Sequence, residues 1–408
     1  SDGDGVPDLI EIAAGTDPLD APSNPHTEGY FFFIMPYMDD PEPLVDHIVF
    51  ATDIQTADVF FALSSSGSMG GEINNLRDSL ATTVVPGILS EMPGVWFGVG
   101  RFEDCRSCAH NMSMLQAMTD DIPSVEAALT GWSICGGNNP YTQYLYALAT
   151  GDVAPFLGWG NITPTSWTCD VIGGIGWPCF RPDSIPIVVQ FADTAFNEAW
   201  TSCSPGFTLD QAVTALNSIS AKYIGVNSGG ARADMAVIAA GTGSVDVMGS
   251  PLVFDISSSG TGLGAQVVDA VEILAHQMPM EVTTRLRDDP SDMVDTVAEF
   301  VDNVEPSVVG GFTDPVDPWV VCVGGLEVDD AYPPFDGRPD SFPSLFPGTP
   351  VCFDITPKQN WTVPAAPEPQ VFQLEINVVA DGIMLDSREV YFLVPPTGAG
   401  SGEIDCPD

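Results

Sequence analysis

The chain has 408 residues, of which 44% are hydrophobic, which predicts a globular protein long enough for two or three domains. Its 56 acidic residues outnumber 11 basic ones, so no basic stripe is available to bind nucleic acid or an anionic membrane. No apolar run reaches the roughly 18 residues that a membrane-spanning helix needs. Most of the carboxylates are expected to be solvated, on a surface that suits divalent cations and saline water.

Residues 1–25 begin with the spacing of an EF-hand calcium loop, in which ligands stand at positions 1, 3, 5, 7, 9 and 12 and glycine at 6. When Asp2 is placed at position 3, Gly5 falls at position 6. The predicted Ca²⁺ ligands are then Asp2, Asp4, the carbonyl of Val6, Asp8 and Glu11. Position 1 would precede Ser1, so we expect the native chain to extend upstream. The alternative is an acidic linker, which does not explain the complete spacing.

This loop resembles the Asp-rich calcium repeats of thrombospondin type 3 and of many bacterial surface proteins. The resemblance implies a rigid spacer whose shape is set by calcium. Asp17 and Asp20, in the following TDPLD, are candidate ligands of a second Ca²⁺.

Strands and helices alternate after the β-rich segments YFFFIMPY and DHIVFAT. The predicted strands are 59–63, 95–102, 185–191, 223–226 and 252–256. The first predicted helix has Ile73, Leu76, Leu80 and Val84 at helical spacing, and others are expected at 142–150, 209–219, 232–240 and 264–276. This alternation predicts an α/β fold of the Rossmann type, with a mostly parallel sheet covered by helices on both faces.

The pattern changes after about Pro279, where turn residues separate apolar runs. The runs VEPSVVGGF, DPWVVCVGGLEV, TPVCFDITPK, VFQLEINVVA and REVYFLVPP predict a C-terminal β-sandwich. YFFFIMPY and DHIVF are candidates to pair with it, which would make the α/β domain an insertion. The expected domains are a calcium loop and linker at 1–25, a β segment at 26–54, the α/β domain at 55–280 and the β-sandwich at 281–408.

Nine cysteines without zinc-ligand spacing favour disulfides in an extracellular protein. They are Cys105, Cys108, Cys135, Cys169, Cys179, Cys203, Cys322, Cys352 and Cys406. Cys105 and Cys108 form a lone CxxC, for which a structural disulfide is favoured over a redox or metal role. Cys169 and Cys179 could close a Gly/Trp/Pro loop, and Cys322 and Cys352 could link two strands. The odd number leaves one thiol free or paired outside this chain.

Three polar segments are expected to meet at the carboxyl ends of the parallel strands, where α/β sheets bind ligands. They are the loop SSSGS at residues 64–68, the segment GGNNPYTQ at 136–143, and Asp193 after a central strand.

Together these segments resemble the von Willebrand factor type A domain, the family that includes the integrin inserted domains, over roughly residues 55–280. In that family the metal-ion-dependent adhesion site reads Asp-x-Ser-Gly-Ser, followed by a Thr or Glu from a second loop and an Asp from a third. The ligands implied for Mg²⁺ or Mn²⁺ are Ser66, Ser68, Thr142 and Asp193. Glu72 stands where the integrin β version places an adjacent calcium ligand.

The chain departs from this pattern at two carboxylates. Ser64 replaces the first Asp, and Tyr141 follows Pro140 where the integrin β version has Glu. Because Mg²⁺ is usually held by one or two carboxylates, the sequence favours a hydrogen-bonded serine loop without metal, with Ser68 as a helix N-cap.

Enzymatic motifs are lacking: the four histidines form no catalytic pattern, and neither a nucleophile elbow nor a phosphate loop occurs. The resemblance extends to myxobacterial-type surface proteins that join a type A domain to a β-domain. It implies a secreted or cell-surface bacterial protein that is not an enzyme and that binds an extracellular protein or surface ligand. The alternative is a structural subunit that self-associates into an extracellular filament or surface layer.

Overall fold

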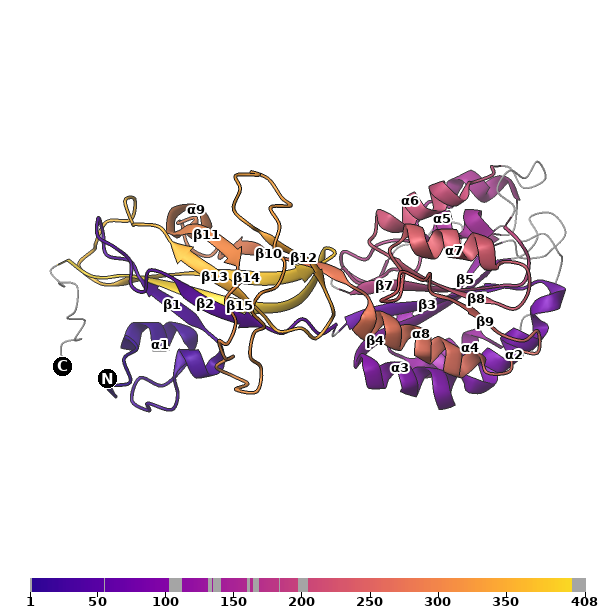
Figure 1. Ribbon diagram of the computed structural model, residues 1–408, viewed down its shortest axis with the longest axis horizontal. Coiled ribbons are helices and arrows are strands. Elements are labelled where there is room, and N and C mark those ends of the chain that lie inside the picture. Colours follow the sequence, from indigo (N-terminus) through magenta and orange to yellow (C-terminus); the bar gives the residue numbers. More distant parts are fainter. Residues whose placement is uncertain are drawn as a thin grey trace. The chain divides into compact units, whose positions relative to one another are not determined.

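The computed structural model describes residues 2–54, 56–102, 112–130, 134, 141–159, 162–163, 169–182, 184–196 and 205–397 (Figure 1). The chain divides into two compact units. The β unit comprises Ser1–Asp53 with Pro279–Asp408, and the α/β unit comprises Ile54–Met278. The α/β unit is therefore inserted in the sequence of the β unit, and its ends lie close to the expected bounds of 55 and 280.

The α/β unit contains a seven-stranded sheet in the order β6-β5-β4-β3-β7-β8-β9. The strands are β3 (Thr56–Ser64), β4 (Gly94–Phe102), β5 (Met112–Thr119), β6 (Ile162–Thr163), β7 (Ile185–Ala192), β8 (Lys222–Asn227) and β9 (Val253–Asp255). Neighbouring strands run parallel except β4 and β5, which are antiparallel. The central strands β3 and β7 are buried almost throughout because helices cover both faces of the sheet.

Helices α5, α6 and α7 lie on one side of this sheet, and α2, α3, α4 and α8 lie on the other (Figure 1). The helices are α2 (Gly70–Ser79), η2 (Gly67–Met69), η3 (Leu80–Val84), α3 (Val85–Glu91), α4 (Ile122–Ala128), α5 (Tyr141–Thr150), η4 (Ala154–Trp159), α6 (Leu209–Asn217), α7 (Arg232–Gly241) and α8 (Leu263–Gln277). The predicted parallel sheet flanked by helices is thus confirmed. The first predicted helix is interrupted by the π-helical turn η3, yet its four apolar residues are all buried.

The β unit consists of two sheets whose apolar side chains form one core. One sheet has the order β1-β15-β14-β10-β12, and the other has the order β11-β13-β2. The elements are α1 (Asp8–Ala14), η1 (Pro25–Glu28), β1 (Phe31–Ile34), β2 (Asp46–Phe50), β10 (Met280–Asp288), α9 (Thr296–Phe300), β11 (Val301–Pro306), β12 (Ser341–Leu345), β13 (Val351–Pro357), β14 (Gln370–Ala380) and β15 (Ile383–Val394). Phe33 and Phe392 stack in this core with ring centroids 5.5 Å apart.

The two early β segments pair with the C-terminal strands, as the sequence led us to expect. β1 runs parallel to β15, and β2 runs antiparallel to β13. The strand predicted within residues 317–328 is wrong, because residues 308–325 form an irregular hairpin with one β-bridge, between Thr313 and Val321. At its base the backbones of Gly310 and Gly324 approach so closely that a Cβ on Gly324 would lie 2.5 Å from the Gly310 nitrogen.

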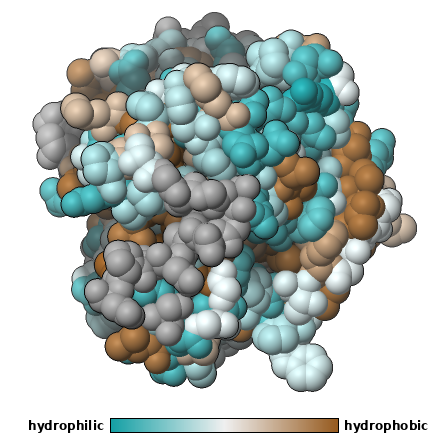
Figure 2. Space-filling view, turned by 90° about the vertical axis from the view of Figure 1, so that its left-hand side faces the viewer, coloured by the Kyte–Doolittle hydropathy of each residue, from teal (hydrophilic) through white to brown (hydrophobic). Residues whose placement is uncertain are grey.

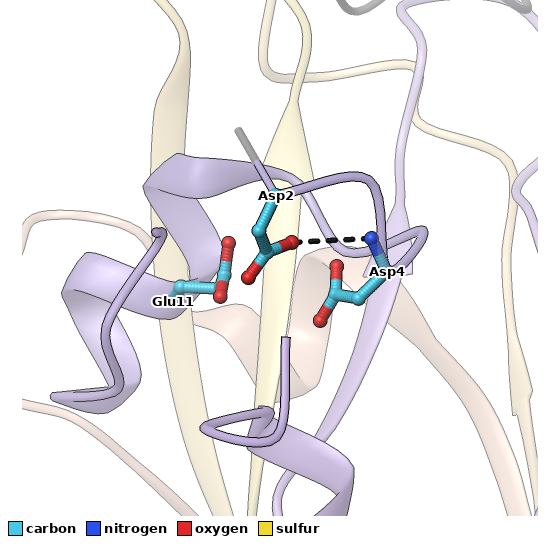
Figure 3. A group of neighbouring side chains, drawn as sticks. All are labelled: Asp2, Asp4 and Glu11. Atoms are coloured by element: carbon cyan, nitrogen blue, oxygen red, sulfur yellow. Dashed lines mark hydrogen bonds between the residues drawn. The ribbon is translucent and has the colours of Figure 1, made fainter. Parts of the chain in front are cut away.

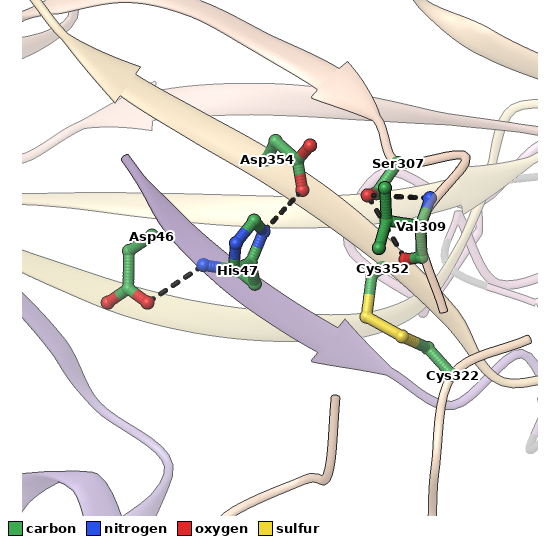
Figure 4. The surroundings of a disulfide bond; sticks show 7 residues. All are labelled: Asp46, His47, Ser307, Val309, Cys322, Cys352 and Asp354. Atoms are coloured by element: carbon green, nitrogen blue, oxygen red, sulfur yellow. Dashed lines mark hydrogen bonds and ion pairs between the residues drawn. A yellow bond between two sulfur atoms is a disulfide. The ribbon is translucent and has the colours of Figure 1, made fainter. Parts of the chain in front are cut away.

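Two disulfides connect the pairs that the sequence suggested, Cys169–Cys179 and Cys322–Cys352. The second joins β13 to the irregular hairpin (Figure 4). Cys105, Cys108, Cys135, Cys203 and Cys406 lie outside the described residues. Disulfides of this kind fit an extracellular protein. Among the described residues, no helix has the length and apolarity needed to cross a membrane.

Candidate functional site

Three acidic side chains converge near the start of the chain. Asp2, Asp4 and Glu11 each offer a carboxylate oxygen within 4.8 Å of the others (Figure 3). Glu11 comes from α1, whereas Asp2 and Asp4 come from the turn before it. That turn needs glycine, because Gly3 and Gly5 have φ values of +81° and +99°. The sequence therefore folds locally so that two carboxylates from the turn and one from α1 face the same point.

Three buried carboxylate oxygens of this cluster have no hydrogen-bond partner. Glu11 is fully buried, and neither of its oxygens accepts a hydrogen bond; Asp2 Oδ2 is also buried without a partner. Burial raises the pKa of Glu11, and the negative charges of Asp4, Asp2 and Asp8 raise it further. Buried carboxylates are normally paired or bound to a metal, so these oxygens fit a divalent cation with hard oxygen ligands.

Asn24 is a neighbour of the cluster that the sequence reasoning missed. Its Nδ2 donates a 2.6 Å hydrogen bond to Asp4 Oδ2, while Asp4 Oδ1 accepts from the Val6 nitrogen at 2.9 Å. Asp2 Oδ1 in turn accepts from the Asp4 nitrogen at 3.1 Å. Asp4 is therefore held in a fixed orientation from both sides. Spacing alone could not show this, because the Asn24–Asp4 contact spans 20 residues of chain.

The remaining predicted calcium residues divide into two groups. Val6 is buried, and Asp8 begins α1 close enough to act on the charge of Glu11. Asp17 and Asp20 are exposed in the turns after α1, where Asp17 Oδ1 accepts from the Leu19 nitrogen. Within the described residues neither belongs to a cluster of three potential ligands, and a second Ca²⁺ shared with an upstream repeat stays a prediction.

The serine loop follows β3 at the carboxyl edge of the α/β sheet. Ser64, Ser65 and Ser66 are buried, and Ser68 is exposed. Ser66 Oγ and Ser68 Oγ lie 3.1 Å apart, and Ser65 Oγ donates to the Phe102 carbonyl. The predicted N-cap role of Ser68 is wrong, because Ser68 lies within η2, whose N-cap position is held by Ser66.

Tyr141, rather than Thr142, reaches Asp193 at this edge. Tyr141 Oη lies 3.5 Å from Asp193 Oδ1 and 3.3 Å from Thr194 Oγ1. Burial raises the pKa of Tyr141 to about 12, and hydrogen bonds with Thr194 and Ser64 oppose that shift. Thr142 points elsewhere, since its hydroxyl donates to the Phe207 carbonyl at 2.8 Å. The prediction missed this because α5 begins at Tyr141, whose ring stacks on Phe196.

Glu72, in α2, is buried near the serine loop. Burial raises the pKa of Glu72; the Ser228 hydroxyl counteracts the shift, and the charge of Asp193 adds to it. The structure thus brings Ser64, Tyr141, Asp193 and Glu72 into one neighbourhood. In the described part of the chain, however, Asp2, Asp4 and Glu11 form the only metal-ligand cluster of three or more acidic, His or Cys residues.

The chain was also compared with known proteins. Neither a scan against protein-family models nor a search of curated proteins gave a match. Functional inference is therefore drawn from the two sites, of which the N-terminal cluster has the better-defined chemistry.

Proposed function

We propose that the chain is an extracellular, calcium-binding protein that binds other macromolecules and is not an enzyme. In this proposal the α/β unit is a von Willebrand factor A-type binding module, and the β unit is a β-sandwich that supports it. The observation that carries the calcium assignment is the buried Glu11 carboxylate. It lies next to Asp2 and Asp4, and neither of its oxygens has a hydrogen-bond partner.

Calcium fits this cluster better than magnesium. Ca²⁺ accepts six to eight oxygens in flexible geometry and commonly takes a bidentate Glu at the last loop position. Glu11 offers both oxygens there, and the loop offers further carboxylates and carbonyls. Mg²⁺ demands near-ideal octahedral geometry and retains several waters, which suits a buried carboxylate less well.

The serine loop supports ligand contacts that do not require Mg²⁺ or Mn²⁺. Its first carboxylate is replaced by Ser64, and the Tyr141 hydroxyl lies between Ser64 and the Asp193–Thr194 pair. We therefore propose that this edge recognises an extracellular protein or surface ligand through the exposed Ser68 and Thr194 hydroxyls, while the buried Ser64 and Tyr141 hydroxyls hold the edge in shape.

Calorimetric titration of Ca²⁺ into the metal-free full chain tests the calcium assignment. We expect the parent to bind Ca²⁺ and Glu11→Gln to lose at least about tenfold in affinity, because a neutral amide replaces a ligating carboxylate. Glu327→Gln is the matched control, since Glu327 is an exposed glutamate of the same unit. No Ca²⁺ binding by the parent, or equal binding by both variants, would reject the assignment.

Self-association is the alternative function, and one observation favours it. The irregular hairpin of the β unit exposes Trp319 at 92% and Val309 at 57%. On the face drawn in Figure 2, apolar side chains lie in patches among hydrophilic ones. Sedimentation velocity in Ca²⁺ separates the two functions. A filament subunit should assemble without a partner and should lose assembly in Trp319→Ser, whereas a binding module should stay monomeric.

A further inference from the structure

We propose that Asn24 is a positioning residue of the calcium site, and that through it ion binding is coupled to the docking of α1 on strand β15. This inference rests on the proposed calcium binding. It assigns a role to a residue outside the loop spacing, and it makes the N-terminal segment an integral part of the β unit.

The amide orientation of Asn24 is determined by its second contact. Asn24 Oδ1 accepts a hydrogen bond from the His26 nitrogen at 2.9 Å. The Asn24 nitrogen donates to Thr27 Oγ1, which completes a capping box on η1. With Oδ1 occupied in this way, only the NH₂ group can face Asp4. The donor therefore holds Asp4 Oδ2 in place while the opposite oxygen is held by the Val6 nitrogen.

The loop that carries the carboxylates also packs on the β unit. Val6 and Ile10 form a small core with Tyr391 and Leu393 of β15. Tyr30, which follows η1, packs edge-on against Tyr391 with ring centroids 5.9 Å apart. The segments before and after the Asn24–Asp4 hydrogen bond therefore both contact β15, so a change in the cluster reaches the strand through side-chain packing.

Charge supplies the coupling. Glu11 is adjacent to Ile10 in α1, and its carboxylate has an oxygen within 4.8 Å of oxygens of the like-charged Asp2 and Asp4. Without a cation, this repulsion acts on the same helical turn that docks on Tyr391. A bound cation removes the repulsion, so the docked arrangement binds the ion more tightly than an undocked one. By reciprocity the ion must favour docking to the same extent.

Two substitutions separate the positioning role from the capping role. In Asn24→Ser the hydroxyl can still cap η1, but it is too short to reach Asp4. Thr27→Val removes the reciprocal capping bond and leaves the Asp4 contact intact. Loss of a residue that orients a ligand typically costs 10- to 100-fold in metal affinity. We therefore expect Asn24→Ser to weaken Ca²⁺ binding by roughly tenfold or more. Thr27→Val should weaken it by less than about twofold.

Hydrogen exchange of α1 supplies a second readout that capping alone would not change. In the parent, Ca²⁺ should slow amide exchange across residues 8–14, and Asn24→Ser should need about tenfold more Ca²⁺ for the same protection. Asn24→Ala, which removes cap and donor together, should bind Ca²⁺ no better than Asn24→Ser. Asn24→Ala is also the variant to compare with Thr27→Val if Asn24→Ser folds poorly.

The outcomes distinguish this inference from the calcium assignment. If the parent binds no Ca²⁺, both are rejected. If the parent binds and Asn24→Ser binds as tightly as Thr27→Val, the role of Asn24 alone is rejected. If affinity falls as expected but Ca²⁺ does not protect α1, the coupling to docking is overturned.

Discussion

Glu11 and Asp58 are both carboxylates without solvent exposure, but their charges are compensated differently. Asp58 accepts hydrogen bonds from the backbone nitrogen and the Nε of Arg181, at 2.6 and 2.8 Å. Glu11 has no cationic neighbour within the cluster and accepts no hydrogen bond. The first carboxylate is satisfied by the fold, whereas the second is left for the cation that we propose. Their surroundings, not their residue type, separate a structural acid from a ligand.

A third carboxylate, Asp46, predicts a pH dependence. Burial raises the pKa of Asp46 on β2, although the His47 nitrogen donates to its Oδ1 at 2.8 Å (Figure 4). A raised pKa in the folded state means that stability is lost as the pH rises through that value. Asp46→Asn keeps the acceptor but cannot ionise. We expect it to raise the free energy of unfolding at pH 8, with a gain that shrinks only as the pH falls through the raised pKa toward the ordinary aspartate value of 3.8.

Urea unfolding of the parent and Asp46→Asn at several pH values, all in excess Ca²⁺, measures this difference. Asp53→Asn is a suitable control, because Asp53 is exposed in the same unit. A gain that grows toward low pH would contradict the assigned direction of the pKa shift.

Ser64 predicts a gain of metal binding. In a Glu11→Gln background, which removes the calcium cluster, we expect no Mg²⁺ or Mn²⁺ binding at micromolar concentration. Ser64→Asp restores a carboxylate beside Ser66 and Asp193 and should introduce such binding, because one or two carboxylates normally hold these ions. Calorimetry with Mn²⁺ measures both variants. Binding without the Ser64 substitution would show that the serine loop holds metal by itself.

At the scale of elements, Arg181 fixes the disulfide-closed loop of residues 169–179 to the sheet. Besides Asp58, its guanidinium donates to the carbonyls of Ala57 and Gly94, and it lies 4.7 Å from the centre of the Trp96 ring. One side chain thus joins the end of the loop to β3 and β4. The end of the loop is therefore packed on the sheet of the α/β unit.

Replacing Arg181 should destabilise the α/β unit strongly. Arg181→Met removes the cation and the Nε donor from the buried Asp58 carboxylate, and one donor from each of two carbonyls. Breaking a buried pair costs about 3–5 kcal/mol. Arg232→Met is the control, since the Arg232–Asp255 pair is exposed and should contribute less than about 1 kcal/mol. Chemical denaturation measures both. A loss for Arg181→Met no larger than the control would refute the anchoring role.

Elements built from local patterns were predictable. Strands β3, β4, β7 and β8 are mostly apolar runs, and the convergence of Asp2, Asp4 and Glu11 follows from spacing within 12 residues. Strand β5, MSMLQAMT, has Thr119 as its one β-branched residue and was missed. The hairpin before Cys322 was misread because its valines look like strand residues, while its shape depends on a glycine contact and a disulfide. Asn24 and Tyr141 act through contacts between distant segments, which no local pattern contains.

At the scale of the whole molecule, the calcium cluster belongs to only one of the two units. A ligand that binds the folded state stabilises the unit whose unfolding destroys its site. In calorimetric scans, Ca²⁺ should therefore raise the melting temperature of the β unit and leave that of the α/β unit nearly unchanged. Glu11→Gln should abolish the shift. A shift of both transitions, or of the α/β transition alone, would contradict this assignment.

The parallel pairing of β1 with β15 has a mechanical consequence. Tension that enters the chain before Phe31 and leaves after Val394 pulls these adjacent strands in opposite directions along their length. All four residue pairs of the ladder, from Phe31–Val390 to Ile34–Leu393, are then loaded together in shear. The inserted unit, Ile54–Met278, lies outside this load path and bears no force while the ladder holds. The segment that carries Asp2, Asp4 and Glu11 precedes Phe31, so it too lies outside the four-pair ladder.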